Sequence, residues 1–217
     1  MTKITTDQSY LNWPFFDDHH RKLAADLEQW CQNNLNDIDH SDVDRACKDI
    51  LLKLAEGGWL KYVVPRAYGG IFEEFDVRSL CLIRETLARH DGLADFVFAM
   101  QGLGSGTITL FGSEQTKQAY LPDVATGEKI AAFALTELES GSDVANMSTS
   151  AEDHGDHFLV SGAKTLISNG GVADYYVLFA RTGEAPGAKG LSAMILDADT
   201  PGLEITERIE VIAPHPL

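Results

Sequence analysis

The sequence has 217 residues, of which 44% are hydrophobic and 23% are charged, and its formal net charge is −16 at pH 7. A chain of this length forms one large domain or two modest ones, and its composition excludes an intrinsically disordered protein. The negative charge repels phosphate backbones, so we expect no nucleic acid as a partner.

Residues 1–127 carry apolar side chains at helical spacing, which predicts an all-helical N-terminal domain. A first helix buries its apolar face between residues 20 and 31, and a second does so between residues 43 and 54. Ser41, with an acidic residue three positions later, is the predicted cap of the second helix, and Gly57 is its predicted end.

Three further helical signals follow in the same half of the chain. A third apolar stripe covers residues 77–88, and the run Phe96–Met100 is apolar on all sides, as in a buried helix. The glycine-rich run 102–107 lacks the third glycine and the lysine of phosphate-binding loops, so we expect a helix end and a loop there. Ser113 is predicted to begin another helix and Gly127 to end it.

Beyond residue 128 the helical period disappears and short runs rich in β-branched and aromatic residues follow, separated by turn residues. Because no helical segment lies between these runs, we expect an antiparallel β-barrel or sandwich domain over 128–217, incomplete at its C-terminal end, and no parallel βαβ units. The fold class is therefore α+β. The predicted strands cover 129–135, 157–162, 164–168, 174–181, 190–197 and 203–210.

The cysteines and histidines form no recognised metal motif, so we expect no metal. The pair His19-His20 lacks the H-E-x-x-H pattern, and Cys31, Cys47 and Cys81 contain no C-x-x-C pair. Such cysteines are typical of reduced thiols. The sequence begins without a basic and apolar leader and has no stretch suited to a membrane span, so we expect a cytoplasmic protein.

Two segments contain residues suited to ligand binding. The first delivers Thr136 at the end of a strand and then offers the free backbone N–H groups of residues 141–143, which can bind an anion or a carbonyl-rich ring. The second, residues 164–171, supplies Ser168 followed by an asparagine and two glycines. Composition alone favours the alternative that these are two ordinary strand–turn junctions.

These segments, FALTExxxGSD from Phe133 and KTxISNGG from Lys164, resemble the middle-domain signature of the acyl-CoA dehydrogenase family of flavoproteins. Residues 57–70 are similar to the family's G…P…YGG segment, and residues 110–137 to its helix-to-barrel junction. The resemblance covers nearly all of residues 13–217. It implies a helical N-terminal domain followed by a β-barrel.

The resemblance also implies a function: members bind FAD, oxidise the Cα–Cβ bond of an acyl-CoA to an enoyl-CoA, and pass electrons to an electron-transferring flavoprotein. It places Thr136 and Ser168 as hydroxyl donors to the flavin ring, with Ser168 near N5, and Ser142 where FAD and the CoA of the substrate both pass. Donors aimed at the ring stabilise the negative charge that it gains. The implied cofactor-binding residues are Phe133, Ala134, Leu135, Thr136, Gly141, Ser142, Leu166, Ile167 and Ser168, and Ser142 also contacts substrate.

The chain departs from the family pattern inside this site, because Leu166 stands where many members have tryptophan and Leu138 where proline is usual. The family also continues past Leu217 with a C-terminal helical domain that usually supplies the catalytic glutamate. We therefore expect no catalytic residue in this chain, and structural places for Glu137, Glu139 and Asp143. The site would then be completed by a C-terminal portion that lies on another chain, in a homo- or hetero-oligomer, or outside this sequence. The alternative is a truncated, inactive fragment or a non-catalytic interaction or flavin-binding module.

Overall fold

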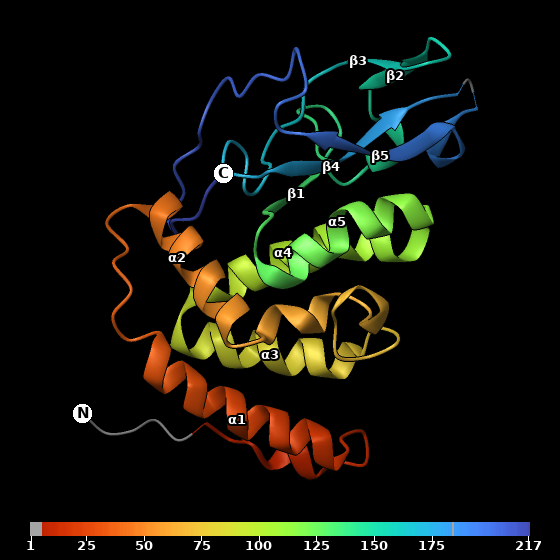
Figure 1. Ribbon diagram of the computed structural model, residues 1–217. Coiled ribbons are helices and arrows are strands. Elements are labelled where there is room, and N and C mark those ends of the chain that lie inside the picture. The colour runs from red at the N-terminus through yellow and green to blue at the C-terminus, as the bar shows by residue number, and fades with distance from the viewer. Residues whose placement is uncertain (1–5, 184) are drawn as a thin grey trace.

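The computed structural model describes residues 6–183 and 185–217 (Figure 1). As predicted, helices occupy the N-terminal half and strands the C-terminal half. In the figure the sheet lies above α4 and α5, while α1 lies at the far end of the helical half. The helices are α1 (Asp18–Asn34), α2 (Val43–Glu56), α3 (Val77–His90), α4 (Gly92–Phe111) and α5 (Glu114–Thr126).

The helix ends follow local capping chemistry. Ser113 accepts a hydrogen bond from the Thr116 N–H (3.1 Å), and Gly127 ends α5 in the left-handed conformation with φ 75°, so both predicted ends of this helix are confirmed. Gly57 ends α2, also as predicted. The predicted cap Ser41 is wrong: the cap is Asp42, whose carboxylate accepts from Arg45 N–H at 3.1 Å.

The predicted apolar stripe of α3 coincides only in part with the buried face of the helix. Val77 is 63% exposed and Cys81 is exposed. The buried face includes two hydroxyl residues, which become compatible with burial because each finds a partner. Ser79 donates to Asp76 (2.7 Å), and Thr86 accepts from Arg89 (3.3 Å).

The glycine-rich run 102–107 is not a helix end, because α4 continues through it to Phe111. Gly104 is required there by packing: a methyl group on it would overlap the Cβ of Ala131 and stand 3.0 Å from the Tyr175 hydroxyl oxygen. The small residue thus lets α4 approach the sheet closely. Glycine usually weakens a helix, but here close contact with the sheet compensates for this cost.

The five strands form a mixed sheet, and in this the expectation of an antiparallel domain was wrong. Strand β4 pairs in parallel with β1 and, through one residue pair, with β2, whereas β4–β5 and β2–β3 are antiparallel. The parallel partner β1 reaches β4 through a long irregular connection that contains the β2–β3 hairpin, so no crossover helix was needed. The strands are β1 (Ala131–Ala134), β2 (Ser150–Asp153), β3 (Phe158–Ser161), β4 (Tyr175–Arg181) and β5 (Leu191–Asp197).

Two predicted strands, 164–168 and 203–210, are irregular segments instead. One face of the sheet joins the main core of the helices through Ala131, Tyr175 and Val177. The opposite face carries a smaller apolar cluster that includes Ala134 and Leu178. Within the described residues, no helix has the length and apolar character needed to cross a membrane.

Candidate functional site

The structure brings the two predicted binding segments side by side. The Thr165 N–H donates to the Thr136 carbonyl (2.9 Å), and the Lys164 ammonium donates to the Leu135 carbonyl (3.0 Å). These bonds join segments that are 29 residues apart in the sequence. Thr136 and Ser168, the two hydroxyl residues singled out from the sequence, are therefore carried by segments that contact each other directly.

The start of β1 is fixed by two buried amide side chains. Gln101 of α4 accepts from the Ala131 N–H and donates to the Lys129 carbonyl, both at 2.8 Å. Asn169 donates to the Ala131 carbonyl, also at 2.8 Å. These side chains replace the neighbouring strand that the edge of β1 lacks at this position, and they satisfy backbone groups that burial would otherwise penalise. Sequence analysis gave Gln101 no role and named Asn169 only as a residue of the second candidate segment; a lone glutamine in an uncharged helical run was the available signal.

Glu137 and Lys164 form a buried ion pair between the two segments. Their side chains are 5% and 8% exposed, and Lys164 Nζ lies 2.9 Å from Glu137 Oε1. Glu137 also accepts from Ser148, through its N–H (2.6 Å) and hydroxyl (2.8 Å), and from the Thr149 N–H (2.9 Å). Burial acts to raise the pKa of Glu137, but the hydrogen bonds at Thr149, Lys164 and Ser148 outweigh it and hold this pKa well below its usual range. Glu137 is thus an ionised structural anchor.

The loop after Lys164 contains two non-glycine residues with positive φ, Leu166 (55°) and Asn169 (64°). Asparagine tolerates this conformation, and Asn169 is held by its bonds to Ala131 and to the Pro216 carbonyl, which accepts from its N–H at 2.8 Å. Leucine tolerates it poorly, at a cost of roughly 1–2 kcal/mol. Leu166 is nevertheless 56% exposed, so an apolar side chain stands in solvent on a strained backbone. Strain of this kind clusters at binding sites.

Thr136 and Ser168 are half-buried, and within the described residues neither hydroxyl group has a hydrogen-bond partner. Gly141 and Ser142 are exposed. The remaining predicted site residues differ in character, because Ala134 is buried and Ile167 packs partly against the small cluster, while the Phe133 ring lies 5.0 Å from that of Phe179. Ala134 could therefore meet a ligand only through its backbone, whereas Phe133 and Ile167 are half-buried. The two segments thus offer two hydroxyl groups without partners and, at Leu166, an exposed apolar side chain.

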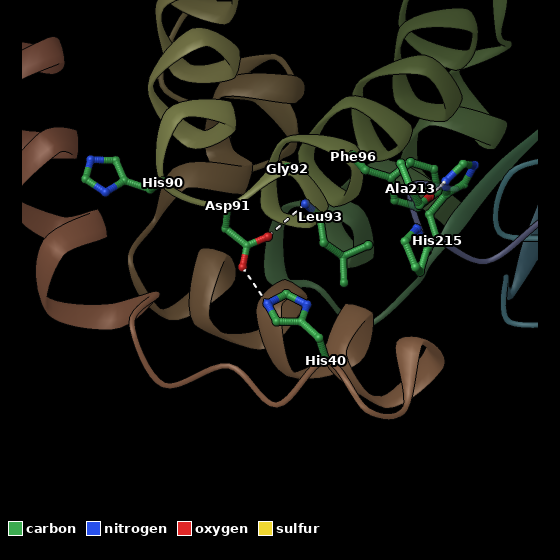
Figure 2. A pocket seen from close by; sticks show the side chains of 9 residues that line it. His40, His90, Asp91, Gly92, Leu93, Phe96, Ala213 and His215 are labelled. Carbon is green, nitrogen blue, oxygen red and sulfur yellow. Dashed lines mark hydrogen bonds and ion pairs between the residues drawn. The ribbon is translucent and has the colours of Figure 1, made fainter. Parts of the chain in front are cut away.

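A cavity of about 430 Å³ lies beside the N-terminus of α4 (Figure 2). Asp91 caps α4 by accepting from the Leu93 N–H (2.8 Å) and pairs with His40 at 3.0 Å. The opposite wall is the C-terminal segment, where the His215 ring lies 4.6 Å from that of Phe96. Phe96 thus lines this cavity. The lining residues are His40, His90, Asp91, Gly92, Leu93, Phe96, Ala213, Pro214 and His215.

Asp17, His19 and His20 bring one potential metal-ligand atom each within 4.8 Å of one another. Both ring nitrogens of His20 are already engaged: Nδ1 accepts from the Asp17 N–H (2.9 Å), so Nε2 carries the proton and donates to Asp76 (2.8 Å). A metal on Nε2 would place a proton on Nδ1, facing the Asp17 N–H. We therefore assign this cluster to the capping box of α1.

Comparison with known proteins gives two family matches. The family model for the acyl-CoA dehydrogenase N-terminal domain matches residues 17–128, and that for the middle domain matches residues 132–214. The chain is similar to glutaryl-CoA dehydrogenase of Desulfococcus multivorans (33% identity over 90% of this chain and 48% of the relative) and to the mitochondrial isobutyryl-CoA dehydrogenase of Dictyostelium discoideum (34%, 95% and 47%).

Among solved structures, the acyl-CoA dehydrogenase from Bacillus anthracis complexed with FAD is similar at a TM-score of 0.76 and 34% sequence identity. That match covers 90% of this chain and 34% of the other. The chain spans about half the length of the two curated relatives named above. The matched half includes both hydroxyl-bearing segments and α4.

Proposed function

Because the chain belongs to the acyl-CoA dehydrogenase family, we propose that its paired segments hold the isoalloxazine ring of FAD and that it forms part of a site oxidising the Cα–Cβ bond of an acyl-CoA. The observation that carries this proposal is the bond from the Thr165 N–H to the Thr136 carbonyl. It joins two segments whose hydroxyl groups, on Thr136 and Ser168, are free of partners in the described chain.

The residues present fit a flavin. Thr136 and Ser168 have free hydroxyl groups for the polar edge of the ring, and Leu166 presents an exposed aliphatic side chain for its face. The flavin, when bound, supplies the acceptor for the hydride that leaves Cβ. The chain's own part is to orient the ring and stabilise its developing negative charge through these donors. Leucine covers less of a ring than an aromatic side chain, so this cover is thin.

Glu137 is unsuited to act as the catalytic base, because both of its carboxylate oxygens are already engaged, in the ion pair with Lys164 and in hydrogen bonds from Ser148 and Thr149. We propose that the base comes from the part of the family's length that this chain does not match, whether that part belongs to the same protein or to a partner in a homo- or hetero-oligomer. Residues 1–127 and 128–217 would act as the helical and sheet domains of one site. Ser142, exposed at the loop, would meet the CoA moiety, and an electron-transferring flavoprotein would accept the electrons.

The proposal is tested by the visible absorption spectrum of the purified chain and by FAD titration followed by flavin fluorescence. We expect near-stoichiometric flavin, and a loss of at least about tenfold in affinity in a Thr136→Val/Ser168→Ala variant, the effect of removing one or two hydrogen bonds. Ser161→Ala on β3 removes a hydroxyl from an exposed strand residue and should leave binding unchanged. If the chain binds no FAD at any concentration in the titration, the proposal is refuted.

A second measurement separates binding from oxidation. A flavin-loaded chain mixed with a short-chain acyl-CoA should lose its visible absorption only when the remaining part of the site is supplied. Bound flavin that no acyl-CoA bleaches, even in the oligomer isolated from the native host, would favour the non-catalytic flavin-binding module over the enzyme.

A further inference from the structure

Lys164 contacts both sides of Thr136. Its ammonium group donates to the carbonyl of Leu135, the residue before Thr136, and to the carboxylate of Glu137, the residue after it, at 3.0 and 2.9 Å. It also lies 3.6 Å from the Met147 sulfur. A single buried cation therefore holds the backbone carbonyl before one predicted flavin-binding hydroxyl residue and the side chain of the residue after it.

Glu137 extends the same connection to a third segment. Its second oxygen accepts from both the N–H and the hydroxyl of Ser148, and its first accepts from the Thr149 N–H. Residues 148–149 lead directly into β2, which pairs with β4. The ion pair is thereby anchored to the sheet and not only to the two loops.

A buried ion pair is weak evidence for stability, because desolvation of the two charges offsets much of their attraction. Its characteristic contribution is conformational specificity. Two charged groups that make all their hydrogen bonds are held in one geometry, whereas an apolar pair would tolerate several. The charges of Lys164 and Glu137 also neutralise each other, so their joint effect on a nearby ligand is one of position more than of charge.

We propose that Lys164 and Glu137 are positioning residues for the flavin site, acting as a clamp that sets the relative placement of Thr136 and Ser168. This inference rests on the proposed function. The clamp acts through the junction between Thr165 N–H and Thr136 O, which lies next to both members of the pair. Without the clamp, the two hydroxyl groups would no longer be held in one fixed relation.

The test compares Glu137→Gln, Lys164→Met and the double variant Glu137→Gln/Lys164→Met. The double variant removes both charges together and leaves neither buried alone, so it should fold even where a single variant does not. Two quantities are measured: FAD affinity, and the hydrogen-exchange protection of the Thr165 amide in the cofactor-free chain. The control is Glu28→Gln/Arg89→Met, which removes a half-buried ion pair of the helical domain.

A clamp predicts that the double variant binds FAD about tenfold more weakly, and that its Thr165 amide exchanges about tenfold faster, while the control variant changes neither quantity. It also predicts that any folded single variant loses as much affinity as the double variant, because the pair acts as a unit. Unchanged Thr165 exchange in the double variant would overturn the clamp regardless of cofactor.

The two proposals fail in distinguishable ways. If the wild-type chain binds no FAD, the proposed function is refuted, and the role of the clamp in placing the flavin is refuted with it. If the wild-type chain and the double variant bind FAD equally well, only the clamp is overturned. Additive losses in the two single variants would show that the residues act separately, which also contradicts the clamp.

Discussion

Replacing Gly104 with alanine tests the close contact between α4 and β1. The new methyl group would overlap the Cβ of Ala131, which is fixed to the backbone and cannot rotate away, and would stand 3.0 Å from the Tyr175 hydroxyl. Overpacking of this kind costs about 1–3 kcal/mol. Alanine in a helix interior returns about 1 kcal/mol relative to glycine, so we expect a net loss of up to ~2 kcal/mol.

Gly106 is the matched control, because it lies in the same helix and a methyl group there would meet no atom of the described chain within 4 Å outside its own turn. Gly106→Ala should therefore stabilise the chain by about 1 kcal/mol. Helix propensity cancels in the difference between the two variants, which isolates the overpacking cost. The free energy of unfolding is measured in urea by tryptophan fluorescence. The reasoning is refuted if Gly104→Ala is as stable as Gly106→Ala.

Three further outcomes are expected. Tyr175→Phe should be neutral or stabilise the chain by up to about 1 kcal/mol in urea unfolding, because the buried hydroxyl has no hydrogen-bond partner among the described residues. Leu166→Gly should raise the melting temperature, since glycine adopts φ 55° without the cost that leucine incurs; an unchanged or lower value would contradict the strain. Stability should also fall in acid. For Asp76, burial acts to raise the pKa, but hydrogen bonds from Ser79, His19 and His20 lower it overall, and the pKa of Glu137 is lowered too. Groups with depressed folded pKa values contribute stability that is present above their unfolded pKa near 4 and is lost as pH falls below it. Thermal unfolding between pH 6 and pH 3 should show this loss, and Glu137→Gln should make the profile shallower.

Much of the helical half was predictable because its signals are local. Caps such as Ser113 and the left-handed Gly127 depend on a few neighbouring residues, and the structure confirms both. The run 102–107 was misread for the opposite reason. Its glycines suggested an interruption, but the requirement at Gly104 comes from Ala131, which is distant in the sequence and contacts α4 only in the folded chain.

The sheet and the site were predictable only in part, because their geometry depends on long-range pairing. Strand β2 has the sequence SAED, which lacks the branched and aromatic residues of a typical strand, and it forms by pairing with β3. Residues 164–168 have strand-like composition but lie in a loop, where Leu166 adopts a positive φ. The hydroxyl residues themselves were identified from the sequence, whereas the buried partners of Lys164 and Ala131 were not.

The position of the candidate site is set jointly by the helices and the sheet. Gln101 of α4 holds the N–H of Ala131, and Asn169, the neighbour of Ser168, holds its carbonyl. Ala131 begins the strand that leads to Thr136, so one buried residue relates both hydroxyl-bearing segments to the helical half. The close approach at Gly104 keeps this residue against α4. Loss of the Gln101 side chain would leave the Ala131 N–H buried against α4 without a partner, and such an unpaired group costs about 1–3 kcal/mol. The helical half is therefore part of the flavin site that we propose, although none of the predicted ring-binding residues belongs to it.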